Sequence, residues 1–378
     1  CGGTLTNGQK LANGKIHRCS DIVWTKWEGS EESEAPITNT GYWYLDKDLT
    51  LTKQQSIAKD AKISLCLNGH DVVQNNPSSR IYSLHNTGAG LALTNCSADP
   101  EKGQLYQKDA VKTTENRLVW VRYGTFDLWA GKINAKDVTN AKYGSAVGSE
   151  KGTVFNMYGG KITGGKVTTN GATLYLRGTL NMLGGVIKNG NSTTGSTGYA
   201  GNVYIGSTGV MNMYGGTITG GKASRHGGNI STETNSAGTG GAVLNMYGGT
   251  VSDGTAQGCG GNIATNPGGI IEIKGGTVKN GKAVQNSDYG RRSQNIFCNA
   301  GTIKMSGGTV EGYTELMGAF SAEFSGKANI SGKQYNLFVP NGGKITLGTL
   351  EKGAALGINS GASADTIIIS DSCQKDAA

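Results

Sequence analysis

The chain has 378 residues, of which 63 are glycine and only 5 are proline. Glycine inside a helix costs about 0.5–1 kcal/mol relative to alanine, so a helical globular protein is excluded. Collagen is excluded as well, because glycine does not recur at every third position and proline is scarce. With 36% hydrophobic residues, the chain is also unlike a disordered protein, and a turn-rich all-β fold is expected.

The formal net charge is +8, and the basic residues are mostly lysines scattered singly. Proteins that bind nucleic acids cluster their basic residues and favour arginine, so no nucleic-acid partner is expected. Single lysines are typical of solvated strand edges, and a weak affinity for an anionic polysaccharide or cell wall is compatible with the charge. No run of about 18 apolar residues occurs, so no transmembrane segment is expected.

Residues 1–45 precede the repetitive part of the chain and contain Trp24, Trp27 and Trp43. Because the end of a repetitive β-structure is an unpaired sheet edge, this segment is expected to form an N-terminal cap. Cys1 and Cys19 could form a disulfide across a glycine-rich ribbon, and the alternative is that Cys1 carries the lipid of a mature lipoprotein.

Cysteine usage also bears on metal binding and on the compartment. The 7 cysteines include neither a Cys-x-x-Cys pair nor the Cys/His spacing of a zinc site. The acidic residues are too dispersed for a calcium site, so neither a metal nor another cofactor is expected. Cys66 and Cys96 are a second candidate disulfide, which would fit a secreted protein.

Short alternating strands are predicted from YWYLDKDLTLT (42–52), ISLCLNGHDVV (63–73) and LALTNC (91–96). The stretch 97–124 departs from this pattern and is expected to be a loop or cap. After it an eleven-residue phrase recurs, typified by MNMYGGTITGG, with copies that begin at residues 126, 155, 180, 211, 244, 271 and 303. Its unequal spacing indicates a rigid unit whose loops differ in length, as in a solenoid.

Each copy of the phrase predicts two strands and a turn. Positions one and three are apolar whereas positions two and four are mostly polar or aromatic, which indicates a half-buried strand. A Gly-Gly pair then turns the chain into a second strand that points a β-branched residue inward. Many copies close on Gly164, Asn189, Gly220, Asp253 or Asn280, which are residue types that tolerate a left-handed backbone.

A third strand of each unit follows an asparagine. Three strands per unit, stacked at about 4.8 Å, define an all-β parallel β-helix. The asparagines recur once per coil, so their amides are expected to form a structural ladder rather than a ligand site. They are Asn202, Asn229, Asn262 and Asn295. We expect the helix to occupy residues 46–350 in about ten coils, followed by C-terminal strands and a tail at 351–378.

The order of motifs resembles a known group. Along the chain the motifs are CGGTLTNG…HRC, WTKWEG, GYWYLDKDLTLT, LCLNGHDVV and LTNC, then repeated NMYGGTITGG with GGNI, and finally NLFVPNGGKITLG. This series is similar to the large secreted or cell-surface right-handed parallel β-helix proteins of gut Clostridia and other Firmicutes. The resemblance covers nearly the whole chain and implies a pectin-lyase-like, right-handed fold and an extracellular location. The Gly-His-Gly and Arg-x-Pro-x-x-Arg motifs of polygalacturonases and pectate lyases are absent.

The outward positions of the phrase form two columns that could bind a glycan. Aromatic rings beside amides at regular spacing can stack on sugar rings and bond their hydroxyls, whereas the alternative is a self-stacking ladder that only covers the sheet. The candidate ligand-binding residues are Trp129, Tyr158, Tyr214, Tyr247, Asn156, Asn212 and Asn245.

Candidates for catalysis are fewer. Glu272 and Glu323 lie two coils apart in one column, with Lys304 between them. This spacing is compatible with an inverting glycosidase pair, and a charge ladder is the simpler alternative. Loops at 190–200, 223–233 and 284–293 carry the other candidates, which could act on or hold an anionic sugar or be solvated loop residues. These candidates are His226, Asp288 and Arg291.

The sequence therefore favours a non-enzymatic extracellular β-helix that serves as an adhesin, stalk or filament. Its expected partner is a cell-wall or host glycan, and self-association into a filament is a further hypothesis. The alternative is a carbohydrate-active enzyme, a polysaccharide lyase or a glycoside hydrolase, with a groove along the helix.

Overall fold

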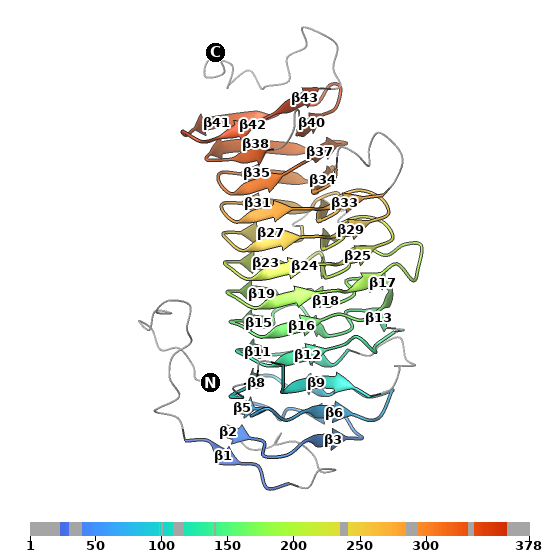
Figure 1. The fold of residues 1–378 in the computed structure, drawn as a ribbon, viewed down its shortest axis with the longest axis vertical. Coiled ribbons are helices and arrows are strands. Elements are labelled where there is room, and N and C mark those ends of the chain that lie inside the picture. Colours follow the sequence, from blue (N-terminus) through green and yellow to red (C-terminus); the bar gives the residue numbers. More distant parts are fainter. Residues whose placement is uncertain are drawn as a thin grey trace.

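The computed structural model describes residues 23–29, 40–97, 99, 101–108, 117–139, 141–234, 241–284, 293–331 and 336–360. These residues form strands and turns but no helix. Three long parallel sheets, here called A, B and C, run the length of the column seen in Figure 1. The fold is a parallel β-helix with three strands per coil, as the sequence predicted.

Sheet A holds the first strand of each repeated phrase. Its strands, in spatial order, are β1 (Thr25–Lys26), β2 (Gly41–Tyr44), β5 (Lys62–Cys66), β8 (Gly90–Thr94), β11 (Thr125–Leu128), β15 (Val154–Met157), β19 (Thr179–Met182), β23 (Val210–Met213), β27 (Val243–Met246), β31 (Ile270–Ile273), β35 (Thr302–Met305), β38 (Ser321–Gly326) and β41 (Thr346–Leu350).

Sheet B holds the second strand of each phrase. Its strands are β3 (Leu49–Leu51), β6 (Val72–Gln74), β9 (Gln104–Gln107), β12 (Lys132–Asn134), β16 (Lys161–Thr163), β20 (Val186–Lys188), β24 (Thr217–Thr219), β28 (Thr250–Ser252), β32 (Thr277–Lys279), β36 (Thr309–Glu311), β39 (Asn329–Ser331) and β42 (Ala355–Leu356).

Sheet C closes each coil. Its strands are β4 (Gln55–Ser56), β7 (Tyr82–Leu84), β10 (Val119–Val121), β14 (Val147–Ser149), β18 (Leu174–Leu176), β22 (Val203–Ile205), β26 (Ile230–Thr232), β30 (Ile263–Thr265), β34 (Ile296–Asn299), β37 (Thr314–Met317), β40 (Leu337–Val339) and β43 (Ile358–Ser360).

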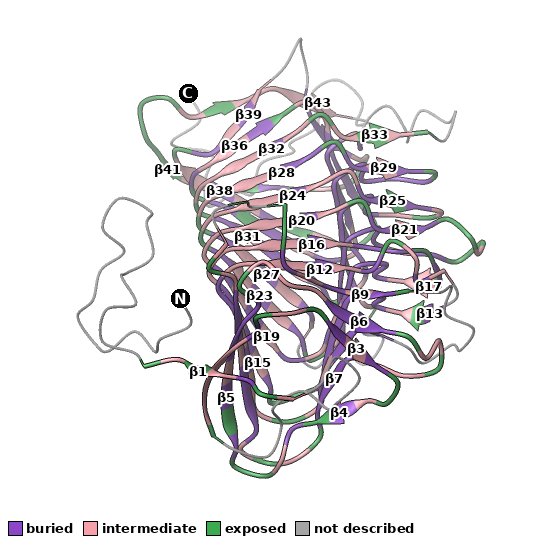
Figure 2. Ribbon diagram, turned by 60° about the horizontal axis from the view of Figure 1, so that its bottom comes forward, coloured by how far each residue is buried: buried purple, intermediate pink, exposed green. Residues whose placement is uncertain are grey.

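Two small sheets form a lobe where the chain passes from sheet B to sheet C. One pairs β13 (Ala141–Tyr143) with β17 (Val167–Asn170), and the other stacks β21 (Asn191–Ser192), β25 (Lys222–Ala223), β29 (Thr255–Ala256) and β33 (Lys282–Ala283). The lobe projects from one side of the column in Figure 2, which also shows exposed residues gathered in turns and loops.

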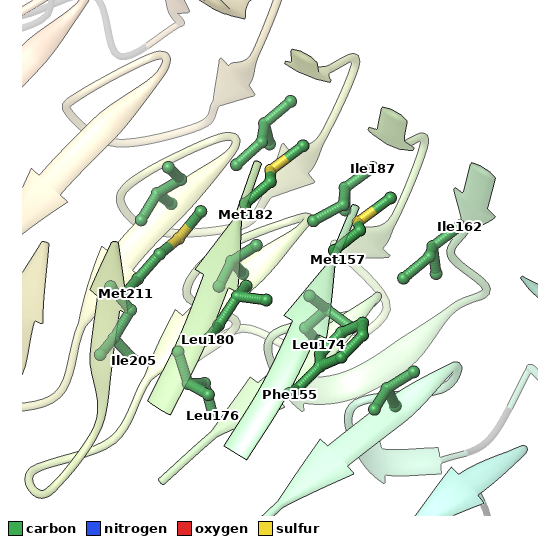
Figure 3. Close-up of a cluster of buried hydrophobic side chains, with 14 of the residues drawn as sticks. Phe155, Met157, Ile162, Leu174, Leu176, Leu180, Met182, Ile187, Ile205 and Met211 are labelled. Atoms are coloured by element: carbon green, nitrogen blue, oxygen red, sulfur yellow. The ribbon is translucent and has the colours of Figure 1, made fainter. Parts of the chain in front are cut away.

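The core is a stack of like residues. Met213 of β23 pairs in register with Met246 of β27, and the same alignment recurs from coil to coil. The apolar residues of sheet A, such as Leu180 and Met182, are fully buried and meet the β-branched residues of sheet B inside the coil (Figure 3). Each such side chain contributes about 1.5–3 kcal/mol through burial, so the alternating pattern stabilises every coil in the same way.

The Gly-Gly turn needs both of its glycines, for different reasons. A Cβ on Gly215 would lie 2.5 Å from the carbonyl oxygen of Leu183, and Gly216 has a φ of 83°. Side chains are disfavoured by close backbone contact in the first case and by left-handed φ in the second.

The residues that close the phrase behave largely as predicted. Asn189, Gly220, Asp253 and Asn280 have φ between 56° and 67°. Gly164 is the exception, because its φ is not positive; a Cβ there would instead lie 2.0 Å from Thr173 Oγ1.

The coils extend beyond the recognisable phrase. Sheets B and C each have 12 strands and sheet A has 13, compared with the ten coils expected. The additional strands pair without the Gly-Gly signature; even the irregular stretch 97–124, expected to be a loop or cap, contributes β9 and β10. Of residues 1–45, the described part supplies β1 and β2 and buries Trp27. Its capping role stays a prediction, and Cys1 and Cys19 lie outside the described residues.

Candidate functional site

The four asparagines that precede strands of sheet C form a buried ladder. The side-chain Nδ2 of Asn202 donates to Asn229 Oδ1, that of Asn229 to Asn262, and that of Asn262 to Asn295, each at 2.7 Å. Each Oδ1 also accepts a glycine backbone N–H at 2.9–3.0 Å. Each Nδ2 also donates a hydrogen bond to a backbone carbonyl oxygen. With their hydrogen bonds directed into the protein, these buried amides act as structural residues.

A second amide ladder runs along the outer face of sheet A. Asn245 donates to Asn212, Asn212 to Asn181 and Asn181 to Asn156, each at 2.9 Å. The ladder ends where Asn156 Nδ2 donates to the Asp127 carboxylate at 2.8 Å. Each amide uses one N–H within the ladder and can direct its second N–H outward.

The aromatic column beside this ladder is stacked on itself. Trp129 and Tyr158 have ring centroids 3.9 Å apart, and those of Tyr214 and Tyr247 are 4.9 Å apart with planes inclined by 7°. Lys274 Nζ lies 5.1 Å from the Tyr247 centroid. Each of these rings therefore packs at least one face, predicted to stack on sugars, against a neighbouring side chain. Trp129 is only 3% exposed, whereas Tyr214 and Tyr247 are 51% and 40% exposed, mainly offering ring edges and hydroxyls to a ligand.

A recess of about 370 Å³ lies where the outer amide ladder ends. The outward position of Asp127 is continued through Ala92 and Ser64 to Tyr42 on successive strands of sheet A. The middle two side chains are small, so the surface is hollowed between Asp127 and Tyr42. At about 4.8 Å per strand, the two ends are about 14 Å apart. We call this hollow the Asp127 recess; Lys62 and Trp129 complete its wall.

Asp127 is an unusual acid within this recess. Burial raises the pKa of its carboxyl group, and the hydrogen bond from Asn156 and the charge of Lys62 oppose that shift. A partly desolvated carboxylate is a strong hydrogen-bond acceptor. The recess thus combines an acceptor, an ammonium donor and aromatic surface.

Glu272 and Glu323 do not form a free carboxylate pair. Glu272, Lys304 and Glu323 are in register on consecutive strands. Glu272 pairs with Lys274 at 2.9 Å and Glu323 with Lys304 at 3.8 Å. This arrangement is a ladder of alternating charges on a solvent-accessible face.

His226 is a packed residue. Its ring lies against Tyr199 and Phe297, with centroid distances of 5.7 and 5.2 Å. Nδ1 accepts the backbone N–H of Cys259 at 2.9 Å, and burial lowers the His226 pKa to about 4. The ring is therefore neutral at pH 7 with Nδ1 occupied. Asp288 and Arg291 lie outside the described residues.

Cys66 and Cys96, the second candidate disulfide, lie side by side in the structure with their side chains reduced, and the disulfide stays a prediction. The Cys66 thiol donates to Cys96 Sγ across 2.8 Å. This hydrogen bond lowers the Cys96 pKa to about 7. The two residues are neighbours on adjoining coils, as a disulfide would require.

The recess was not predicted from the sequence. A signal was present: GLALT (90–94) and KISLC (62–66) align with TFDL (125–128) and place Ala92 and Ser64 at the outward position. A loss of outward side-chain volume in consecutive coils predicts a hollow.

Comparisons with protein-family models, with curated proteins and with solved structures gave no match. Across the described residues, no group of three or more His, Cys, Asp or Glu side chains is placed to hold a metal ion. The part of the chain covered by the structure contains no helix that is long and apolar enough to cross a membrane.

Proposed function

We propose that this chain is an extracellular, non-enzymatic β-helix module that binds a glycan along the outer face of sheet A. The observation that carries the proposal is the Asp127 recess at the end of the outer amide ladder. The extracellular location is proposed on the resemblance of the sequence to surface β-helix proteins, and self-association into a filament stays a prediction.

The recess offers the groups that recognise a sugar. An ionised Asp127 only accepts hydrogen bonds and suits sugar hydroxyl donors, while Lys62 Nζ suits hydroxyl oxygens. Tyr42 supplies aromatic surface for the apolar face of a sugar ring. Protein carbohydrate sites need such a mixture because a sugar has both polar edges and apolar faces.

The ladder extends this site along the column. Asn156, Asn181, Asn212 and Asn245 repeat an outward amide at the strand spacing of about 4.8 Å. A periodic array of donors and acceptors suits a polymer better than a single sugar, since each contact is weak and their number gives the affinity.

Binding is favoured over turnover by the state of the candidate catalytic groups. Glu272 and Glu323 each form an ion pair with a lysine, and the Nδ1 atom of His226 accepts a backbone hydrogen bond. General acid–base catalysis requires groups directed at the substrate, and these three side chains are engaged with the protein.

A glycan array with the full chain, followed by product analysis on every hit, tests the proposal. We expect a neutral glycan to bind without turnover and Asp127→Ala to weaken that binding at least about tenfold, the value of one charge-assisted hydrogen bond. The control is Glu311→Ala, which removes an exposed acid from sheet B. New reducing ends or unsaturated products would show an enzyme instead, and equal affinities of the two variants would remove the recess from the site.

A further inference from the structure

Three guanidinium groups gather around one indole ring on the outer face of sheet C. The Cζ atoms of Arg80, Arg117 and Arg122 lie 4.3, 5.5 and 5.4 Å from the Trp120 ring centroid. Trp120 is the middle residue of β10, which Arg117 precedes and Arg122 follows; Arg80 comes from the preceding coil, just before β7. Cation–π attraction holds the arginines around the ring.

The neighbouring strand leaves room for this cluster. Gly148 of β14 is in register with Trp120. A Cβ at Gly148 would lie 2.5 Å from Cδ and 2.6 Å from Nη1 of Arg117. The Arg117 side chain therefore lies across the bare backbone of Gly148 and is 6% exposed as a residue. Glycine within a strand often marks such a close approach.

Positive charge is concentrated at the cluster. Glu150 accepts the Trp120 Nε1–H at 3.4 Å and pairs with Arg177 at 3.5 Å. Arg122 Nη1 lies 3.1 Å from His85 Nε2. The cluster therefore brings three positively charged groups to one aromatic ring on the outer face of sheet C.

We propose that this cluster binds the oxyanion group of an acidic polysaccharide, either a sugar carboxylate or a sulfate ester. Guanidinium groups match both oxyanions through paired N–H donors. Aromatic surface continues beyond Gly148, where Tyr175 of β18 is next in register and lies 4.8 Å from Tyr143 between ring centroids. Tyr175 also stacks on Tyr204 at 5.8 Å, so these rings offer edges and hydroxyls, rather than open faces, to the sugar that carries the anion.

This site is independent of the Asp127 recess. It lies on a different sheet and has the opposite charge preference, because the Asp127 carboxylate would repel an acidic sugar. Asp127→Ala is therefore expected to leave binding of the acidic polymer unchanged, so failure of either proposal does not imply failure of the other.

The test is titration calorimetry of the full chain with dextran sulfate, polygalacturonate and unmodified dextran. We expect binding of at least one acidic polymer and none of dextran, with an affinity that falls as NaCl is raised. The polymer that binds identifies sulfate or carboxylate as the recognised group. Absence of binding to both acidic polymers would overturn the proposal.

Arg122→Gln and Arg80→Gln should each weaken binding at least about tenfold, the loss expected for a hydrogen bond to a charged group. Arg225→Gln is the matched control, since Arg225 also lies 5.4 Å from an aromatic ring, that of Tyr199, but on the lobe. Equal losses in Arg225→Gln and Arg122→Gln would mean attraction by overall charge, against the proposal.

Gly148→Ala separates geometry from charge. It displaces Arg117 without changing the net charge, so binding should weaken while the far-UV spectrum and melting temperature show a folded protein. If the three single variants Gly148→Ala, Arg122→Gln and Arg80→Gln all bind the acidic polymer as tightly as the wild type, the anion binds elsewhere and the proposal is wrong.

Discussion

The Cε methyl of Met182 occupies the space beside Gly216 in the next coil, 2.6 Å from where a Cβ on that glycine would lie. The same relationship joins Met213 to Gly249 and Met246 to Gly276. Methionine is flexible enough to fill this gap beneath a turn. The repeated methionine and the second turn glycine are thus two halves of one packing contact.

Gly216→Ala should destabilise the fold through both φ and packing. A left-handed non-glycine residue costs about 1–3 kcal/mol, and the methyl would also meet Met182 Cε and the Gly185 carbonyl oxygen. Gly152→Ala is the control, because Gly152 has a φ of 82° but a Cβ added there would have no atom within 4 Å. Urea unfolding should show a larger loss for Gly216→Ala; equal losses would mean that the methionine contact contributes nothing.

The buried ladder should be far more sensitive than the outer one. Asn229→Ala leaves the Gly221 N–H and the Ser252 carbonyl without the side-chain partners they have in the wild type, and each unsatisfied buried group costs about 1–3 kcal/mol. Asn245→Ala, on the half-exposed ladder, should cost less than about 1 kcal/mol because water replaces the lost bond. Chemical denaturation of both variants measures the difference, and similar values would contradict the assignment of structural and surface roles.

Cys96 should be the most reactive of the described thiols near neutral pH. Its pKa is lowered to about 7 by the hydrogen bond from Cys66, whereas burial raises the pKa of Cys259. Alkylation by iodoacetamide, located by mass spectrometry, should rise through pH 7 at Cys96 first. Cys66→Ala removes the donor and should move that midpoint upward; an unchanged midpoint would show that the hydrogen bond does not set the reactivity.

Oxidised glutathione should convert the same pair into a disulfide. Their sulfur atoms are 2.8 Å apart and the residues are 30 apart in sequence, and closing a loop of this size contributes about 2–4 kcal/mol. The measurement is the loss of two titratable thiols together with a higher melting temperature. Cys96→Ser should abolish both effects, and retention of both thiols under oxidising conditions would contradict the expectation.

Protonation of His226 should weaken the fold as the pH falls. Its folded-state pKa is about 4, compared with the ordinary histidine value of 6.5, so between these values the unfolded chain binds more protons. Stability is therefore full above pH 6.5 and falls by up to about 3 kcal/mol toward pH 4. Urea unfolding at pH 7 and 4.5 measures the slope, which should be shallower in His226→Gln; identical slopes would exclude His226 as the cause.

The repeating unit of this fold can be predicted from the sequence alone. The alternation around Met213 specifies a strand, because side-chain direction in a strand has a period of two. Gly215 and Gly216 specify the turn that follows, and Asn229 before the next strand specifies a ladder position. Stacking such units follows, since each coil can bury its faces only against the next. Recurrence along the chain was enough to predict three strands per coil.

The contacts of the outward residues, by contrast, depend on how the coils stack. Arg80 and Trp120 are on adjacent coils because of the length of the intervening loops and the register of β7 with β10, neither of which the phrase encodes. The same holds for the Asp127 recess, which depends on Ala92 and Ser64 in coils that lack the Gly-Gly signature. Burial is set by local alternation, whereas contacts across a surface are set by the stacking of coils that are distant in sequence.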